Sequence, residues 1–410
     1  MIAEAARRRP ALTAGLLAAL AHALFWLALP ASMQRNQSTD YFEVNEPVAR
    51  QIAAGHGITT PAGTPASAKS PGQSILLAGC FWLAGVTGLS EDLVLRLYVV
   101  GTMGVAAGLL YRLFLVLLSP RVALWGVVLW TLHPMTLWIA KQPNTEVPFF
   151  AFFFGALLAA GTHGLLCGLL LGMAMLIRPI GLLLPAVLLV WLWLDARWPW
   201  RRLAIFGVTL VVGCALAVGP WEIWVHQKTG RWILLSEHGT ASLMDGLTFG
   251  VKGGDMGATL VRAELLPLMQ DMLDEQIAGR MDTNVQVFSY LGRRLREEPA
   301  LVVELFAVKT LRSWFGTNGK WMELAIALVQ LPFVLLAGRG LWQFWRAGDR
   351  ERSFGLLCLL LTGYFWAMTV TALSIVRYLL PPMAVLCAAV AAGAGLARAP
   401  GSAERPAEKG

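Results

Sequence analysis

Charged side chains are scarce in this chain, and those able to do chemistry stand at the borders of long apolar runs. Two are acids: Asp40 follows the first apolar run, and Glu146 stands just before the run that starts at residue 147. Three are bases: Lys69, Arg178 and Arg377. A carboxylate can act as a general base towards a hydroxyl group, and cations can stabilise negative charge that builds up on a reacting group.

Each of these residues also has a plain structural interpretation. Asp40-x-x-Glu43 has the spacing of a helix-capping box, in which Glu43 would be structural. Glu146 could be a first-turn acid that complements a helix dipole. Arg178 could extend its side chain to lipid headgroups, and Arg377 permits the same interpretation. Lys69 could be a solvated loop lysine. Both sets of interpretations stay open until the elements that position these residues are considered.

The composition identifies the solvent of most of the chain as a membrane. Of the 410 residues, 57% are hydrophobic and 14% are charged, and the mean hydropathy is +0.61. Soluble proteins carry roughly 25% charged residues. The net charge of +8 comes from short basic clusters between apolar runs, as in membrane proteins, and does not predict nucleic-acid binding. The 17 Trp residues also fit a membrane–water boundary.

A membrane-spanning helix needs about 20 mostly apolar residues, and the run at residues 73–88 is only marginally long enough. If residues 73–88 stay outside as an interfacial or re-entrant helix, the basic clusters at residues 7–9, 121, 197–202, 346–352 and 398–409 all face the cytoplasm. This obeys the positive-inside rule, and the alternative violates it. Ten spans follow, with both termini inside: 11–30, 93–118, 121–141, 147–162, 164–178, 180–195, 203–221, 321–342, 354–376 and 378–397.

The predicted fold is an all-α polytopic membrane protein with about ten transmembrane helices, interfacial helices in the first outer loop and a small helical outer segment. Residues 1–221 form an N-terminal transmembrane module whose first outer loop, residues 31–92, would carry the catalytic acid. Residues 222–320 form a non-cytoplasmic helical segment, residues 321–397 the C-terminal transmembrane helices, and residues 398–410 a disordered cytoplasmic tail.

Helical patterns recur inside the two outer segments. In the first, an amphipathic helix over residues 41–54 is stopped by Gly55-His56-Gly57. In the second, one helix is expected around residues 258–280 and another after Pro299. The latter has Leu301, Leu305, Val308 and Leu311 at helical spacing, with Lys309 and Arg312 on another face, as in a helix resting on headgroups.

Cysteine and histidine residues do not form a metal-binding pattern. The five Cys residues are far apart inside apolar runs and indicate packing. His22 and His133 lie within predicted spans as core groups, and His226 and His238 have no metal-ligand spacing. His56, flanked by glycines in the first loop, could belong to a site. No cofactor is required, although a divalent metal held by Asp40 and Glu146 is an alternative.

Seven short motifs, in order, resemble the GT-C glycosyltransferases, and most closely glycosyltransferase family 39, which includes protein O-mannosyltransferases and lipid A aminoarabinose transferases. The motifs cover most of the chain: Ser38-Thr39-Asp40-Tyr41, Ala53-Ala54-Gly55-His56-Gly57, Lys69-Ser70-Pro71-Gly72, Pro143-Asn144-Thr145-Glu146, Ile177-Arg178-Pro179, Gly219-Pro220-Trp221 and Arg377-Tyr378-Leu379-Leu380-Pro381. Two positions depart from the family pattern: Tyr41 stands where many relatives have a second acid, and Ser70-Pro71 where many have two prolines.

The resemblance implies an inverting transfer of a sugar from a polyprenyl-phosphate donor to an acceptor hydroxyl on a lipid, glycan or protein. Asp40 would be the base and Glu146 an acceptor-site or metal-site acid. Lys69, Arg178 and Arg377 would bind the phosphate, with Tyr41 beside them. The composition suggests a bacterial inner membrane, with the site on the periplasmic face. The donor sugar and the acceptor stay open.

Two other functions compete with this prediction. A secondary transporter or flippase often shows two similar halves with interrupted helices and charges buried within spans. Here no such repeat is visible, and most charges stand at span ends. The second competitor is a non-catalytic membrane subunit that binds a lipid-linked glycan, with Asp40 only as a helix cap.

Overall fold

The computed structural model describes residues 10–34, 40–195, 198–251, 261–317 and 319–396, and within them the regular structure is helical, without strands. The basic clusters at residues 7–9 and 398–409, Arg197, the motif residues 38–39 and the predicted C-terminal tail lie outside the described residues. Helices suit a membrane environment, because they satisfy their backbone N–H and C=O groups within one segment.

Six helical stretches are long and apolar enough to cross a membrane. They support an integral membrane protein, as the composition predicts. The stretches are α2 (Pro10–Ala28), α5 (Glu91–Leu117), α11 (Trp200–Thr229), α16 (Lys320–Arg346), α17 (Asp349–Thr371), and Val376–Gly393, which joins the 3₁₀ turn η5 (Val376–Leu379) to α18 (Leu380–Gly393).

The prediction of ten spans is not confirmed, because the other four regions hold shorter helices. They are α6 (Pro120–Leu132), α8 (Glu146–Ala159), α9 (Gly164–Ile177) and α10 (Leu184–Asp195). A 14-residue helix such as α8 or α9 is about 21 Å long, less than the roughly 30 Å of a bilayer core. The predicted 121–141 span breaks at His133, where Pro134 starts the short helix α7 (Pro134–Ile139).

The short helices form the interior of the bundle. All 14 residues of α18 are buried, as are most residues of α8 and α9. Helices α9 and α11 approach closely where Gly168 faces Gly213, and a Cβ added to Gly168 would collide with the Leu210 carbonyl. Small residues at such positions let membrane helices pack backbone to backbone.

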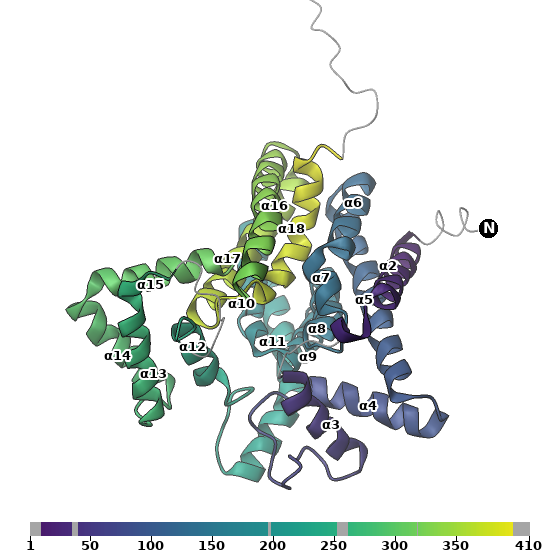
Figure 1. The fold of residues 1–410 in the computed structure, drawn as a ribbon. Helices are drawn as coiled ribbons and strands as arrows, with labels where there is room; N and C mark the ends of the chain where they lie inside the picture. Colours follow the sequence, from purple (N-terminus) through teal and green to yellow (C-terminus); the bar gives the residue numbers. More distant parts are fainter. Residues whose placement is uncertain (1–9, 35–39, 196–197, 252–260, 318, 397–410) are drawn as a thin grey trace, which may run out of the picture.

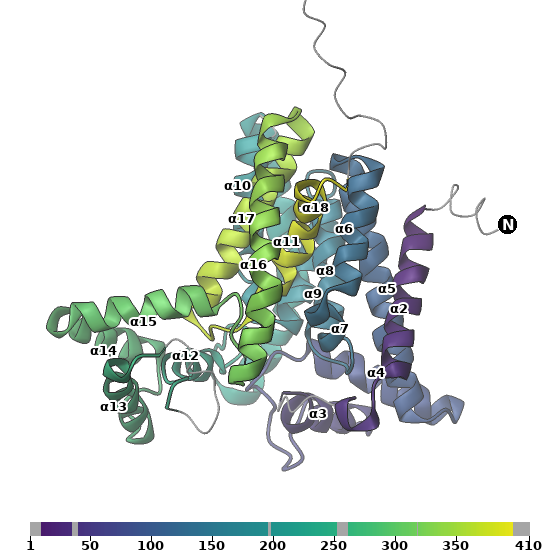
Figure 2. The ribbon, with the colours of Figure 1, turned by 45° about the horizontal axis from the view of Figure 1, so that its top comes forward.

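The segment of residues 31–92 lies at one end of the bundle, below in Figure 2, whereas the turn between α16 and α17 lies at the other end. The predicted 41–54 helix is a π-helical turn, η2 (Asp40–Asn45), followed by α3 (Glu46–Ala53). Gly55 and Gly57 follow it with positive φ angles of 83° and 79°, which glycine adopts without strain. Helix α4 (Gly72–Thr87) lies across the bundle end (Figure 1), in the orientation expected of an interfacial helix.

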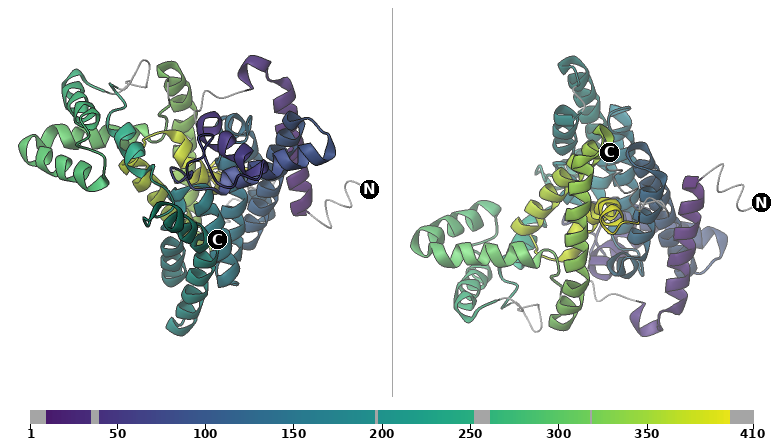
Figure 3. Two further views of the ribbon diagram at one scale, coloured as in Figure 1. Left: turned by 90° about the horizontal axis from the view of Figure 1, so that it is seen from below. Right: turned by 90° about the horizontal axis from the view of Figure 1, so that it is seen from above.

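The segment after α11 has a separate hydrophobic core and lies to one side of the bundle (Figure 3). It contains α12 (Gly239–Leu247), α13 (Leu266–Ile277), α14 (Asn284–Glu297) and α15 (Pro299–Arg312). Helix α11 continues through Pro220 and past the predicted boundary at residue 222 to Thr229, and it ends at the left-handed Gly230. Of the helix predicted over 258–280, only residues 266–277 are α-helical, and residues 258–260 lie outside the described residues.

The prediction that Lys309 and Arg312 rest on lipid headgroups is wrong. Their side chains are 0% and 2% exposed, whereas Leu311, expected to pack inwards, is 59% exposed. The spacing of apolar residues on α15 defines faces but does not say which face meets protein. The inward face of α15 meets main-chain carbonyl groups near the end of α17, and these accept hydrogen bonds from both cations.

Candidate functional site

Three of the short helical elements in the bundle interior place a charged residue at the same end of the bundle. Glu146 is the first residue of α8, Arg178 directly follows α9, and Arg377 lies in the turn η5 that leads into α18. Pro179 helps to end α9, because a helix rarely continues into a proline. The ends of these packed helices therefore bring residues that are distant in sequence together.

Glu146 is fully buried and forms ion pairs with both Arg178 and Arg377. A buried carboxylate without a partner would be very costly, so the two guanidinium groups are what allow Glu146 to stay ionised in the interior. Arg178 also lies over the ring of Tyr378, with its Cζ atom 4.9 Å from the ring centre. Glu146 thus holds the side chains of Arg178 and Arg377 in position.

Asp40 completes a group of five charged side chains, which we call the site cluster: Asp40, Lys69, Glu146, Arg178 and Arg377. The Asp40 carboxylate pairs with Lys69 through one oxygen and with Arg377 through the other, at 3.3 Å from Nη2. Arg377 therefore joins the two acids of the cluster, because its Nε donates to Glu146. Three cations face two carboxylates, so the site cluster carries excess positive charge.

A cavity of about 350 Å³, called here the central cavity, opens above the site cluster. Asp40, Lys69, Arg178 and Arg377 line it, whereas Glu146 lies behind them. Apolar side chains, among them Ile177, Ile180 and Met368, line another part of the wall. A further part comes from the segment after α11: Ser236, His238, Gly239, Ser242, Leu243, Asn284 and Phe288. A charged end and an apolar wall suit an amphiphilic anion.

Electrostatics keep the Asp40 carboxylate ionised. Burial alone would raise the pKa of Asp40, but Arg377 and Lys69 outweigh burial and hold this pKa below its usual value. Across the cavity, burial and the nearby Lys69 lower the pKa of His238, so its imidazole is neutral at pH 7. The cavity therefore presents one ionised acid, several cations and a neutral histidine.

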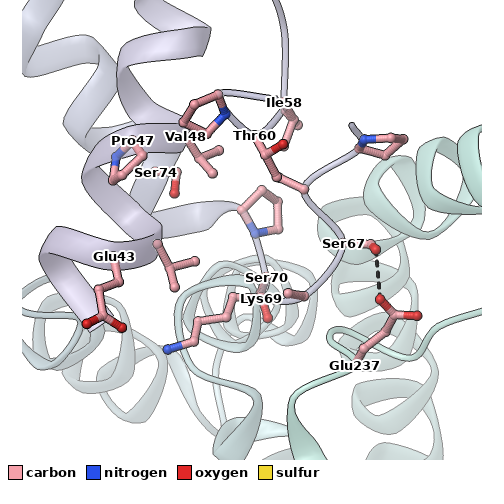
Figure 4. A pocket seen from close by; sticks show the side chains of 16 residues that line it. Glu43, Pro47, Val48, Ile58, Thr60, Ser67, Lys69, Ser70, Ser74 and Glu237 are labelled. Atoms are coloured by element: carbon pink, nitrogen blue, oxygen red, sulfur yellow. Dashed lines mark hydrogen bonds between the residues drawn. The ribbon is translucent and has the colours of Figure 1, made fainter. Parts of the chain in front are cut away.

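A second cavity of about 340 Å³, called here the loop cavity, lies between α3 and the loop of residues 58–71 (Figure 4). Pro47, Val48 and Ile58 contribute apolar surface, and Ser67 donates a hydrogen bond of 2.8 Å to Glu237 at its rim. Lys69 and Ser70 line both cavities. The Ser70 hydroxyl is buried and has no hydrogen-bond partner among the described residues.

The structure places the predicted site residues unequally. Asp40, Lys69, Arg178 and Arg377 line the central cavity and Glu146 supports them, but Tyr41 does not line it. Tyr41 is buried in a small cluster with Ala49, Leu77, Ala78 and Phe81. Among the cavity-lining residues that sequence reasoning missed are Tyr378, Asn45 and those of the segment after α11. Only Tyr378 had a signal, as the neighbour of Arg377.

The residues present do not form a ready metal site. The described residues contain no group of three or more His, Cys, Asp and Glu side chains that could hold a metal ion. The Arg377 guanidinium bonds to both Asp40 and Glu146. A divalent metal shared by the two carboxylates would therefore have to displace this arginine. The five cysteines are free thiols, of which four are buried.

Comparison of the chain with protein-family models and with curated proteins found no match. The functional assignment therefore depends on the geometry of the site cluster and on the order of the short motifs. The two agree in one respect: five of the seven motifs each contribute one member of the site cluster.

Proposed function

We propose that this protein is a membrane glycosyltransferase similar to family 39, which transfers a sugar from a polyprenyl-phosphate donor to an acceptor hydroxyl. The observation that carries the proposal is the Asp40 carboxylate on the wall of a cavity that also holds three cations. The site would face the non-cytoplasmic side, because the basic turn between α16 and α17 lies at the opposite end of the bundle (Figure 2).

The excess positive charge of the site cluster supports binding of a phosphate group. Lys69, Arg178 and Arg377 can donate hydrogen bonds to it, and arginine suits planar, bidentate contacts with phosphate. Ile177, Ile180 and Met368 would contact the first part of the polyprenyl chain. The amphiphilic wall of the central cavity thus matches a lipid phosphate better than it matches a free sugar.

The transfer step moves one proton and one glycosyl group. The Asp40 carboxylate accepts the proton of the acceptor hydroxyl while the acceptor oxygen forms a bond to the anomeric carbon. The bond from that carbon to the phosphate oxygen breaks, and its electron pair leaves with the phosphate. Attack from the face opposite the leaving group inverts the configuration. Lys69, Arg178 and Arg377 stabilise the charge that develops on the phosphate.

Donor binding would also activate Asp40. In the structure, Lys69 and Arg377 hold the pKa of Asp40 low, which makes it a weak base. A bound phosphate competes for the same two cations and adds negative charge nearby, so the pKa of Asp40 would rise when the donor is present. A stronger base would then be available only in the complex that needs it.

The loop cavity is a suitable place for the acceptor. It adjoins the central cavity, because Lys69 and Ser70 line both. Its hydroxyl groups at Thr60 and Ser70 can bond to a hydroxylated acceptor, and its prolines provide apolar contact. An acceptor hydroxyl held here would approach Asp40 from the side opposite the lipid tail.

The decisive experiment measures sugar transfer in nanodiscs from a panel of polyprenyl-phosphate sugars, with the wild type, Asp40→Asn and the control Asp282→Asn. Asn keeps the shape of Asp40 but cannot accept the proton, so we expect a loss of about 100- to 10,000-fold. Asp282 is exposed and lines neither cavity, and its variant should retain full activity.

Other outcomes would redirect the proposal. If folded Asp40→Asn transfers sugar as fast as the wild type, Asp40 is not the base. If the wild type transfers no sugar from any donor, the protein is better explained as a glycan-binding subunit or a transporter, and a donor-binding assay with the same lipids would separate these two.

A further inference from the structure

Besides the site cluster, the protein contains a second group of buried charges, which we call the joint cluster: Lys309, Arg312 and Glu323. All three side chains are almost inaccessible, with exposed fractions of 0%, 2% and 0%. Lysine and arginine are almost never fully buried unless they are paired. The hydrogen-bond partners of Lys309 and Arg312 therefore show which segments the joint cluster holds together.

Lys309 ties three segments together with one ammonium group. Its Nζ atom donates to the Gly246 carbonyl at 2.6 Å and to the Ala372 carbonyl at 2.8 Å. Gly246 belongs to α12, Lys309 to α15, and Ala372 directly follows α17. Helices α12 and α15 both belong to the segment beside the bundle, and so Lys309 joins that segment to the end of a long membrane helix (Figure 1).

Arg312 holds the next part of the same chain. Its Nη1 donates to the Ser374 carbonyl at 2.9 Å, and its Nη2 donates to the Thr317 carbonyl and to Glu323, both at 2.7 Å. Two residues further on, the Val376 amide donates to the Gly316 carbonyl at 3.0 Å. Main-chain groups of residues 372, 374 and 376 are thus all bonded to α15 or to the turn that follows it.

Two glycines show how closely the surfaces fit at this joint. A Cβ atom on Gly246 would collide with the Ala372 carbonyl and come within 2.9 Å of Lys309 Nζ. A Cβ atom on Gly316 would come within 2.5 Å of the Ser374 carbonyl. Neither position can accept a side chain unless residues 372–376 move.

The held stretch leads directly to the site. Residue 377 follows the last bonded amide, and Arg377 is the side chain that joins Asp40 to Glu146. We propose that Lys309 and Arg312 are positioning residues, which hold residues 372–376 so that Arg377 reaches both carboxylates of the site cluster. The segment after α11 therefore does more than cover the central cavity, because it sets the geometry of the cavity's charged wall.

The main-chain part of this inference is independent of the proposed function and is tested by hydrogen–deuterium exchange. In Lys309→Met, two carbonyl groups lose their donor while the aliphatic stem is kept. We expect exchange in peptides covering residues 372–379 to rise about tenfold, through local opening. The matched control is Arg280→Met, in the same segment, where the exposed arginine pairs with Glu275 and contacts neither α17 nor residues 372–376 through that pair.

Catalytic readouts distinguish positioning from simple loss of folded protein, and this arm rests on the proposed function. With Arg377 displaced, Asp40 loses a stabilising cation and keeps Lys69, Arg178 and the neutral His238 around it, with Glu146 behind. The acid limb of the kcat/KM profile should move up by about half a pH unit to one pH unit. We also expect kcat to fall about 10- to 100-fold, with donor KM changed less.

The exchange result for Lys309→Met decides the inference. Faster exchange at 372–379 together with the shifted acid limb supports the inference. Unchanged exchange in folded Lys309→Met overturns it, whatever the activity of the protein. If Lys309→Met does not fold, Gly246→Ala tests the same joint without removing a charge, and unchanged exchange there also overturns the inference. Absence of transfer by the wild type counts against the proposed function alone, because the exchange experiment needs no substrate.

Discussion

The site cluster and the joint cluster are alike in composition and different in what surrounds them. Each has a fully buried glutamate, Glu146 or Glu323, paired with arginine. In the joint cluster, the donors of Lys309 and Arg312 bond to carbonyl groups and to one carboxylate of the protein itself. In the site cluster, Lys69, Arg178 and Arg377 also border a cavity. Buried charge alone is therefore a poor marker of a functional site, and buried charge beside a cavity is a better one.

The largest expected difference between the clusters comes from matched substitutions of the two glutamates. Glu146→Gln and Glu323→Gln each remove one charge from a buried pair, and each should lower the free energy of unfolding by about 3–5 kcal/mol. Only Glu146→Gln releases Arg178 and Arg377 at the cavity wall, so it should reduce sugar transfer about 100- to 1000-fold. Glu323→Gln, which acts through the main chain, should reduce it about tenfold.

Both quantities are measurable on the same samples, by thermal unfolding in detergent and by transfer in nanodiscs. Activity should be normalised to the folded fraction, since both variants are destabilised. Equal losses of transfer in the two variants would remove the distinction between the clusters and would make Glu146 a structural residue only.

The sequence predicted the composition of the site cluster better than its geometry. Asp40, Lys69, Arg178 and Arg377 were found because each breaks or borders an apolar run, and the alternating direction of membrane helices brings such borders together. Tyr41, expected beside them, does not line the central cavity. Asp40 and Tyr41 are consecutive in the π-helical turn η2, where successive side chains point in different directions, so the neighbour of a cavity-facing Asp40 points into a different environment. Here that environment is the small apolar cluster with Leu77 and Phe81.

Other features had no signal in the sequence. Hydrophobicity does not fix the length of a helix, so the predicted spans 147–162 and 164–178 correspond to α8 and α9, which are shorter than a bilayer core. The inward face of α15 could not be assigned, because its carbonyl partners at residues 372 and 374 lie about 60 positions further along the chain. The cavity wall formed by His238, Asn284 and Phe288 depends on loops whose paths no periodicity specifies.

An effect of intermediate size is the pH dependence of stability, which distinguishes Lys309 from the cations of the site cluster. Burial, with the nearby Arg312, lowers the pKa of Lys309 to about 7. The unfolded chain, where lysine titrates near 10.4, binds more protons between these values, so stability rises with pH across that window. The slope contributed by this group is at most about 1.4 kcal/mol per pH unit.

Thermal unfolding of the wild type and of Lys309→Met at pH 7, 8 and 9 measures this contribution as a difference. We expect the wild type to gain stability relative to Lys309→Met as pH rises. A constant difference over this range would mean that the two carbonyl groups keep Lys309 charged, and the joint cluster would then be as permanently ionised as the site cluster.

The smallest expected effect concerns Ser70, which lines both the central cavity and the loop cavity. The Ser70 hydroxyl has no partner among the described residues, so Ser70→Ala leaves no protein group unsatisfied and should change stability by less than about 0.5 kcal/mol. A substrate that bonds to this hydroxyl would lose about 0.5–1.5 kcal/mol, or about 2- to 10-fold in kcat/KM. Ser67→Ala is the matched control, because its hydroxyl already bonds to Glu237.

Ser67→Ala should therefore show the opposite pattern, with a loss of stability and little change in kcat/KM. If Ser70→Ala is as active as the wild type, no substrate group bonds to the Ser70 hydroxyl, and the loop cavity is not supported as the acceptor site. If instead the loss appears in the acceptor KM and not in the donor KM, the two cavities hold different substrates. The boundary between them is then formed by the same two residues, Lys69 and Ser70, of which Lys69 pairs with the proposed base.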